Sequence, residues 1–410
     1  MKSEIKTKNG LPLEVKYCKK CNLSNQRTLG KNEYFHTEKT IHKTVIFDEN
    51  GICAGCKFVE KEFDDTINWD EREKELKELC DKFRKNNGEY DCLVPGSGGK
   101  DSVYASHILK YKYKMNPLTV TWSPHVYTDI GWQNFQSWLH KGGFDNYLYT
   151  PNPKIHRLIT KEAVKRLLHP FQPFIIGQKT FAIKMAAKLN ISLIFYGEMQ
   201  GKGGKGISHK AKSFSESKWL GFEMDPLEGK DFKEAFLGGK QVAHYIDDGI
   251  PLSELNSYKP LNIDVINKKK IDFYFLGYFL RWVPQEMYYY ASQNIDFNAN
   301  PERTEGTYTK YKSLDDKIDG FFYYTSFIKF GIGRAMFDSA EEIRHGHITK
   351  EEGKALINKF DGEYPKKYED EFFKYISIKK EEFLEICDKF RPEHIWEKKS
   401  NRWVLKRPLE

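Results

Sequence analysis

The stretch YDCLVPGSGGKDSV, residues 90–103, joins a short apolar run to a turn of small residues and then to a helical pattern. An apolar run that ends in proline and glycine predicts a buried β-strand. A glycine turn between a strand and a helix exposes several backbone N–H groups in one direction, and the start of the helix adds partial positive charge. We therefore expect a phosphate-binding site at this turn.

The side chains of the turn suit the same ligand. Its glycines, at positions 96, 98 and 99, let the backbone approach an anion closely. We expect phosphate oxygens to contact Lys100 and the hydroxyls of Ser97 and Ser102, and Asp101 to hold magnesium or to cap the helix. Neither the Walker spacing G-x-x-x-x-G-K-S/T nor the dinucleotide pattern G-x-G-x-x-G followed by an acidic residue is present. The alternative interpretation is a helix that merely begins with small residues.

Strand and helix patterns alternate around this turn. Apolar runs predict strands at 90–96, 116–124, 145–152 and 191–199, and helical patterns lie at 100–113, 131–143 and 179–190. A further helix is predicted over 68–88, with Asp70 as its N-cap and Gly88 as its end. Such alternation is typical of an α/β fold with a parallel sheet that is covered on both faces.

The segment SGGKDS (97–102) matches every fixed position of S-G-G-x-D-S, and it resembles the PP-loop of the ATP pyrophosphatase superfamily. The resemblance implies an adenine nucleotide alpha hydrolase-like domain that binds ATP with magnesium and cleaves it between the α- and β-phosphates. Lys100 and Asp101 would act in catalysis. Adenine and ribose would lie at the ends of the second and fourth strands, near Thr121, Trp122, Ser123, Tyr196, Gly197 and Glu198. Plain core packing is the alternative for Trp122.

Two cysteine pairs, CKKC (18–21) and CAGC (53–56), predict a metal site. Four thiolates at Cys18, Cys21, Cys53 and Cys56 suit a closed, structural zinc site, with a redox pair or an iron–sulfur cluster as alternatives. The segment between the pairs is expected to form a small β-ribbon. Cys80 and Cys92 lie on apolar faces and are interpreted as unreactive core thiols.

Composition bounds the remaining possibilities. The chain has 410 residues, of which 39% are hydrophobic, and a formal net charge of +8 with lysines spread along it. This suits a solvated surface with a site for an anionic ligand, although nucleic acid remains possible. The most apolar stretch, IDFYFLGYFLRWV (271–283), is shorter than a membrane span, and the N-terminus carries no apolar signal region. We therefore expect a cytoplasmic protein with reduced thiols.

We divide the chain into a zinc-binding N-terminal module (1–66), a PP-loop ATP-binding α/β domain (67–262) and a helical C-terminal domain for substrate and partner (263–410). The segment GKGGKG (201–206) is interpreted as a mobile loop, with anion binding as the alternative.

Two C-terminal stretches carry a more specific resemblance: NPERTEGTYTKYKSLDDKIDGFFYYTSFIKFGIGRA (300–335) and EEIRHGHITKEEG (341–353). With the cysteine pairs and the glycine turn, they resemble the bacterial N-acetyl sugar amidotransferases of the WbpG and PseA type over nearly the whole chain. The resemblance implies that ATP adenylates the amide oxygen of an acidic, nucleotide-linked N-acetyl sugar. Ammonia then displaces AMP and gives an acetamidino sugar for O-antigen or flagellin glycans.

The resemblance also implies partners: a glutaminase and a barrel-type ammonia-channelling subunit, both similar to the subunits of imidazole glycerol phosphate synthase. The residues agree that ammonia must come from elsewhere, because Lys2 stands where an N-terminal cysteine nucleophile would be and the four N-terminal cysteines are committed to metal. We expect neither a nucleic-acid nor a membrane partner.

Candidates for substrate contact are Arg303, Thr304, Thr307, Tyr308, Lys329 and Arg334, with a solvated face or structural ion pairs as the alternative. The run DDKID (315–319) is interpreted as a charged helix start rather than a magnesium or ammonia site. His345 and His347 are interpreted as exposed rather than as acid–base groups.

Two rival functions remain. A PP-loop enzyme that thiolates tRNA is the first, although only Cys387 lies beyond residue 92. A zinc-bearing scaffold that binds nucleotide without turnover is the second.

Overall fold

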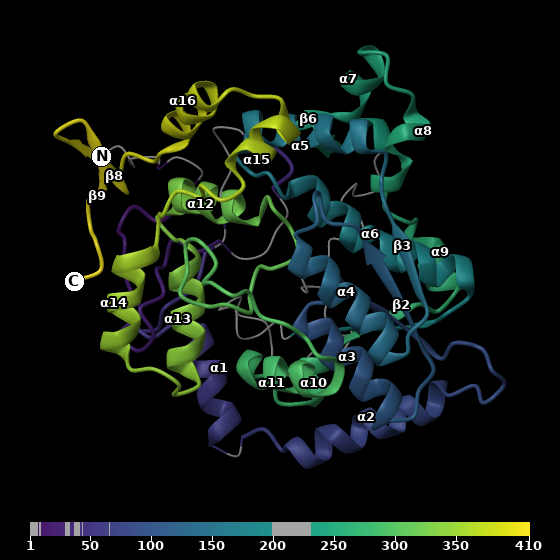
Figure 1. Cartoon of the computed structure of the whole chain (residues 1–410). Helices are drawn as coiled ribbons and strands as arrows, with labels where there is room; N and C mark the ends of the chain where they lie inside the picture. The colour runs from purple at the N-terminus through teal and green to yellow at the C-terminus, as the bar shows by residue number, and fades with distance from the viewer. Residues whose placement is uncertain are drawn as a thin grey trace.

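The computed structural model describes residues 7, 10–28, 33–36, 42, 44–64, 66–198 and 231–410. Five parallel strands form a central sheet in the order β3-β2-β1-β4-β7. Strands β2 and β3 of this sheet are labelled in Figure 1. The predicted α/β fold with a parallel sheet is therefore confirmed. The strands are β1 (Cys92–Pro95), β2 (Pro117–Trp122), β3 (Asn146–Tyr149), β4 (Leu193–Tyr196) and β7 (Asp272–Phe275).

Successive residues of the strands face opposite layers of helices, as the period of a β-strand requires. Leu93 packs into a core beneath two helices, whereas its neighbours Cys92 and Val94 pack into a second core on the other face. Two helices cover the first face, α5 (Pro153–Leu167) and α6 (Gln172–Leu189). Four helices cover the second face: α2 (Trp69–Phe83), α3 (Lys100–Tyr111), α10 (Leu276–Phe279) and α11 (Pro284–Ile295). Helix α4 (Asp129–Gly142) packs beside α3.

The strand order reverses at β1. The chain leaves β1 for β2 and β3 on one side and then returns to β4 and β7 on the other. In open α/β sheets, ligands bind outside the carboxyl ends of the strands at such a reversal. The glycine turn that follows β1 therefore lies at the place where this fold binds ligands.

Three sequence expectations differ from the structure. Strand β7 lies beyond residue 262, so the sheet continues into the segment predicted to be a separate helical domain. The N-cap of α2 is Asn68 rather than Asp70, because the Asn68 side chain accepts from the amide of Glu71. The same helix ends at Phe83, well before Gly88, because Arg84 has extended backbone geometry.

The C-terminal part is mostly helical, as expected. It also ends in an antiparallel hairpin that the sequence did not predict, β8 (Trp396–Lys399) with β9 (Arg402–Leu405). The helices are α12 (Asp319–Phe330), α13 (Arg334–Arg344), α14 (Lys350–Phe360), α15 (Glu369–Ile376) and α16 (Lys380–Phe390). Shorter elements between β4 and β7 are β5 (Phe236–Leu237), β6 (Lys240–Gln241), α7 (Val242–Asp247), α8 (Leu252–Leu255), α9 (Ile263–Lys268) and the 3₁₀ turns Phe232–Glu234 and Asn256–Tyr258.

The N-terminal cysteine segment shares a core with this C-terminal part. All four cysteines of the two pairs belong to one cluster with Met336, Ala340 and Ile357, and the segment runs beside α13 and α14 in Figure 1. Its helix is α1 (Ala54–Phe63). Between the pairs, the described residues form an isolated antiparallel bridge, Thr28 with Thr44, instead of the predicted regular ribbon.

The segment GKGGKG (201–206) lies outside the described residues. In the part of the chain that the structure describes, no helix has the length and apolar character needed to cross a membrane.

Candidate active site

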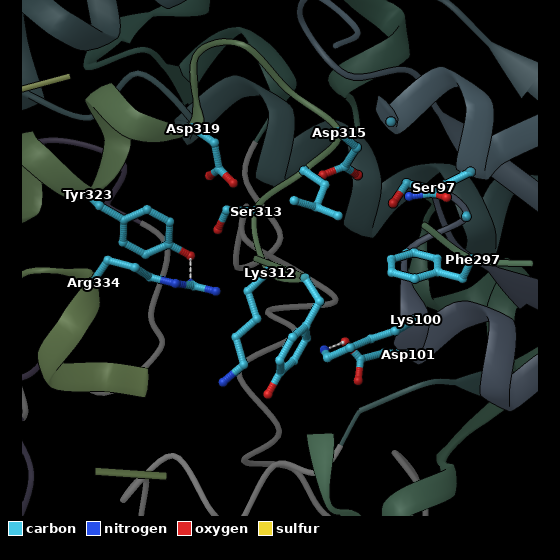
Figure 2. A pocket seen from close by; sticks show the side chains of 16 residues that line it. Ser97, Lys100, Asp101, Phe297, Lys312, Ser313, Asp315, Asp319, Tyr323 and Arg334 are labelled. Atoms are coloured by element: carbon cyan, nitrogen blue, oxygen red, sulfur yellow. Dashed lines mark hydrogen bonds and ion pairs between the residues drawn. The ribbon is translucent and has the colours of Figure 1, made fainter. Parts of the chain in front are cut away.

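A cavity of about 260 Å³ separates the glycine loop (residues 96–99) from the C-terminal part. Figure 2 shows Ser97, Lys100 and Asp101 on one side and Tyr323, Arg334 and Asp319 on the other. We call it the main cavity. Its lining comprises Ser97, Gly98, Gly99, Lys100, Asp101, Gly131, Asn134, Phe297, Tyr311, Lys312, Ser313, Leu314, Asp315, Asp319, Tyr323 and Arg334.

The near wall has the geometry of an anion site. Helix α3 begins at Lys100, and its N-cap is Gly99, which has no side chain to occupy the amides of the first turn. The Lys100 ammonium lies 2.6 Å from the Asp101 carboxylate. Ser102, predicted to contact phosphate, instead donates to the carbonyl of Gly99 over 2.9 Å and so braces the turn. Backbone amides, Ser97 and Lys100 are left to bind an anion.

Two features of this wall require glycine at position 98. Its φ is +85°, in the left-handed region, and a Cβ added to it would lie 2.7 Å from the Cα of Phe135 in α4. Gly88 has a similar φ of +86° but no heavy atom within 4 Å of an added Cβ. The two glycines therefore have similar φ values, but a neighbouring helix leaves no space for a side chain at Gly98 alone.

We expect Gly98→Ala to destabilise the protein by several kcal/mol, about 1–2 kcal/mol from the left-handed backbone and the rest from the displaced helix. Gly88→Ala should cost only the backbone part. Thermal unfolding of both variants measures the difference. Equal losses of melting temperature would contradict the close approach of α4 to the loop.

The residues predicted to hold adenine and ribose lie apart from the main cavity. The Trp122 ring is buried among Tyr149, Phe181 and Tyr258, and an added Cβ on Gly177 would lie 2.1 Å from it. The alternative interpretation of Trp122 as a core residue therefore describes it correctly.

The other members of this group have separate places. The Thr121 hydroxyl accepts from the Asn146 amide over 3.0 Å, within the sheet. Glycine at 197 lets the end of β4 approach α3, because an added Cβ would lie 2.7 Å from the Asp101 carbonyl oxygen. Glu198 is exposed just beyond this strand end.

The far wall carries two cations, Lys312 and Arg334, that share the Asp338 carboxylate, and Lys312 also pairs with Glu341 over 2.8 Å. Asp338 of α13 lies 3.2 Å from both the Lys312 ammonium and the Arg334 Nε, and it accepts from the Thr307 hydroxyl over 2.6 Å. Burial opposes ionisation of Asp338, but Arg334 and Lys312 outweigh it and lower the pKa of the carboxyl below its usual value. Arg334 also contacts the Tyr323 hydroxyl. Arg334, predicted to contact the substrate, lines the main cavity, and so does Lys312, which the sequence analysis did not single out.

Asp319 is the first residue of α12, which agrees with a charged helix start, and two carboxylates of the run 315–319 also face the main cavity. Asp315 and Asp319 both line the cavity, and burial raises the pKa of each. Asp316 points away and accepts from the backbone and Nδ1 of His125, each over 2.7 Å. This clamp holds the segment that presents Asp315 and Asp319.

The pKa of Asp319 gives a pH dependence that can be measured. Burial raises it from 3.8 to about 7, helped by Asp315 and Asp316 and opposed by Arg334. Between these values the unfolded chain ionises Asp319 while the folded chain keeps it protonated, so this group lowers stability as pH rises from about 4 to 7. Asp319→Asn should therefore become more stable relative to the wild type over that range, by up to about 4 kcal/mol. A constant difference in unfolding free energy between pH 4 and 8 would contradict the shift.

The remaining predicted substrate residues lie elsewhere. The Lys329 side chain is buried, contacts Glu33 and donates to the Leu167 carbonyl over 2.9 Å, so it is a structural ion pair away from the cavity. Arg303 and Thr304 line a separate cavity. Tyr308 is absent from the described residues that line the main cavity.

Neither His345 nor His347 is among those lining residues either. The His347 Nδ1 lies 2.5 Å from the Glu342 carboxylate, and His345 Nδ1 lies 2.9 Å from the Glu341 carbonyl oxygen. Both are therefore held on α13 and the turn after it; His345 is partly buried, whereas His347 is exposed, as expected.

The four cysteines fit a tetrahedral metal ion. Cys21 and Cys53 sulfurs lie 3.6 Å apart, those of Cys18 and Cys56 lie 3.8 Å apart, and all four lie within 4.8 Å of one another. Four sulfurs at about 2.3 Å from a tetrahedral ion would lie about 3.8 Å apart. The buried cluster could therefore bind a metal.

Neighbouring donors suit thiolates at this cluster. The Cys53 amide donates to the Cys18 sulfur and the Cys56 amide donates to the Cys53 sulfur, over 3.3 and 3.4 Å. Arg344, at the end of α13, contacts the sulfurs of Cys21 and Cys53 over 3.3 and 3.5 Å. Helix α13 thus has the cysteine cluster at one end and Arg334, on the main cavity, at the other.

Comparisons with solved structures give weak overall similarity. An NH3-dependent NAD synthetase from Campylobacter jejuni has a TM-score of 0.28 and 16% identity, covering 50% of this chain and 93% of that chain. The U34-tRNA thiolase NcsA from Methanococcus maripaludis has a TM-score of 0.30 and 13% identity, and the match covers 75% of this chain and 86% of that chain. An NMN synthetase from Francisella tularensis has a TM-score of 0.26 and 13% identity, and the match covers 50% of this chain and 93% of that chain.

Sequence comparisons are more local. The uncharacterized protein MJ1599 of Methanocaldococcus jannaschii is 39% identical over 85 residues, which are 21% of this chain and 29% of that relative. The match thus spans less than a third of the relative's length. Residues 305–409 match the family described as LPS biosynthesis protein WbpG-like, C-terminal domain. The far wall of the main cavity, from Tyr311 to Arg334, lies inside this match, so it belongs to the part of the chain that is similar to the WbpG-like C-terminal domain.

Proposed function

We propose that this protein is an ATP-dependent amidotransferase that acts on the N-acetyl group of an acidic, UDP-linked sugar. One observation carries the proposal: a single cavity has the SGGKD loop as one wall and the WbpG-like domain as the other. A loop suited to phosphate and a domain related to lipopolysaccharide biosynthesis thus face one reaction space. The product would be an acetamidino sugar for O-antigen or flagellin glycans.

The near wall would hold the phosphates that leave. The first-turn amides of α3 and the Lys100 ammonium offer positive charge where the β- and γ-phosphates would lie. Negative charge grows on the β-phosphate as pyrophosphate departs, and preorganised donors stabilise it most in the transition state. Magnesium would bind at the Asp101 carboxylate and neutralise phosphate charge.

The far wall would hold the sugar. Asp338 favours the charged forms of both Lys312 and Arg334, Glu341 adds to this at Lys312, and both cations face the cavity, so they suit a carboxylate or phosphate of the substrate. Tyr311 and Phe297 add flat apolar surface of the kind on which sugar rings pack. In this arrangement the acetamido group would lie between the cations and the glycine loop.

The proposed reaction proceeds in two steps, adenylation of the amide and displacement of AMP by ammonia. The amide oxygen forms a bond to the α-phosphorus, and the bond to the bridging oxygen breaks, so that pyrophosphate leaves with the electron pair. Ammonia then forms a C–N bond to the acetamido carbon, and AMP leaves with the C–O electrons and the original amide oxygen. The product is an amidinium cation with three N–H hydrogens, one from the original amide and two from ammonia, and the third hydrogen of ammonia leaves as a proton to solvent. Activation is needed because an unactivated amide has no adequate leaving group.

The cysteine cluster would hold zinc in a structural role. Four thiolates leave a tetrahedral zinc without an open position, so it would not take part in the chemistry. It would instead fix the end of α13 through Arg344. We further propose that a glutaminase and a barrel-type channelling subunit supply ammonia, and that the protein works in the cytoplasm.

The rival function, tRNA thiolation, needs a reactive cysteine at the nucleotide. Cys387 is the only cysteine beyond residue 92, it is buried in α16, and burial raises its pKa to about 12. A thiol in that state is a poor nucleophile.

The proposal is tested by ATP–pyrophosphate exchange against a panel of free and UDP-linked N-acetyl sugars, followed by amidation with ammonium chloride. We expect exchange that depends on an acidic N-acetyl sugar, and an amidine product when ammonium is added. ADP as the product would refute the proposal, and so would exchange that depends on RNA and on none of the sugars.

A further inference from the structure

A second cavity of about 40 Å³ lies directly behind the main cavity. The two share Ser313, Leu314 and Asp319 as wall residues, so they lie on either side of the same short segment. The outer wall of the second cavity includes Arg303, Thr304 and Lys367. Most of its lining residues lie in the segment 300–321, at and before the start of α12, and in the segment 365–368 before α15.

The second cavity has a fixed and largely neutralised frame. Arg303 forms a bidentate pair with Glu363, both contacts at 2.7 Å, and Glu363 also accepts from the Gly306 amide over 2.7 Å. Lys317 pairs with Glu371 over 3.1 Å. Among the described residues that line both cavities, Asp319 is the charged one, whereas Glu305, Asp316 and Lys367 line the second cavity alone.

Size decides what the second cavity could admit. Its volume has room for a molecule near the size of water. The proposed reaction needs such a molecule. With ATP on the glycine loop and the sugar on the far wall, the main cavity is filled from its mouth, so a third reactant needs another entrance.

We propose that the second cavity is the entrance for ammonia, which reaches the acetamido carbon by passing Ser313 and Asp319. This inference rests on the proposed function and adds a route to it. Ammonium arrives as a cation attracted to the Asp319 carboxylate; it gives one proton to that carboxylate and continues as neutral ammonia. The proton then returns from Asp319 to water after the product leaves.

Asp319 is suited to this exchange by its surroundings. It faces Arg334 and Tyr323 on one side and Asp315 on the other, and the Ser313 hydroxyl lies beside it. Burial raises its pKa to about 7, so both protonation states are populated near neutrality. The same carboxylate could not accept a proton readily at its ordinary pKa of 3.8.

Two neighbouring lysines offer a matched test of the route. Lys366 and Lys367 are both exposed, but only Lys367 lines the second cavity among the described residues. Lys367→Trp would place a bulky ring over the entrance, and Lys366→Trp would place the same ring beside it. Ammonium chloride is the probe, at saturating ATP and sugar.

We expect Lys367→Trp to raise the KM for ammonium about fivefold or more with little change in kcat, and Lys366→Trp to match the wild type. Unchanged melting temperatures of both variants show that the fold is intact. A wild-type KM for ammonium in Lys367→Trp overturns the route alone. Lack of any ammonium-dependent product from the wild type overturns the proposed function and the route together.

Discussion

Lys100→Ala should lower the rate of ATP–pyrophosphate exchange by about a hundredfold to a thousandfold, the usual effect of removing one preorganised charge donor from a transition state. Lys100 is the first residue of α3, its side chain is 8% exposed, and it lies beside the glycine loop on the main cavity. The ammonium would lie next to the β-phosphate, where charge grows as pyrophosphate leaves. The effect should appear mainly in kcat, because the backbone amides would still bind ATP.

Lys112→Ala is a matched control for this variant. Lys112 follows the same helix at its other end, is exposed, and pairs with Glu73 over 3.0 Å. Its replacement should leave exchange within about twofold of the wild type, since surface ion pairs contribute little. Exchange in Lys100→Ala within tenfold of the wild type would contradict the role given to the loop.

Cys53→Ser should remove the bound metal and lower the melting temperature by about 10 °C or more, because metal-binding free energy at such sites is folding free energy. The Cys53 sulfur lies 3.6 Å from that of Cys21 and accepts from the Cys56 amide and from Arg344. Without it, the buried Arg344 guanidinium loses part of its compensating charge. The damage should reach α13 and therefore Arg334 on the main cavity.

Zinc content by elemental analysis and thermal unfolding measure this outcome. Cys387→Ala provides the control, because Cys387 is also buried but lies in α16 outside the cluster. We expect one equivalent of zinc in the wild type and in Cys387→Ala, and none in Cys53→Ser. Iron in place of zinc, or full zinc occupancy in Cys53→Ser, would contradict a structural zinc site.

Much of the sheet could be predicted because its signals are local. Four of the five strands end in proline, glycine or asparagine-containing turns and alternate with helical patterns, and these patterns suffice to predict a parallel sheet. Strand β7 was missed because it begins the apolar run 271–283, which continues into α10. A continuous apolar run cannot be assigned to strand or helix by periodicity alone.

In the candidate site too, local sequence signals predict one part, the glycine loop, and not the other, the far wall. The glycine loop carries its own backbone requirements, so its residues could be identified from the sequence. The far wall depends on tertiary contacts: Lys312 faces the cavity because Asp338, 26 residues later, holds it there. Lys329 resembled a surface cation in the sequence, yet α12 buries it against Glu33. The same uncertainty applied to Trp122, since a strand end can present its side chain to a ligand or to the core.

The most direct test of the account follows the amide oxygen. A UDP-linked N-acetyl sugar labelled with ¹⁸O at the acetamido carbonyl is incubated with ATP, magnesium, ammonium chloride and the protein, and the nucleotide product is analysed by mass spectrometry. If this oxygen attacks the α-phosphorus, AMP carries one ¹⁸O atom for each amidine formed. Unlabelled AMP, or ADP in place of AMP, would contradict adenylation of the amide.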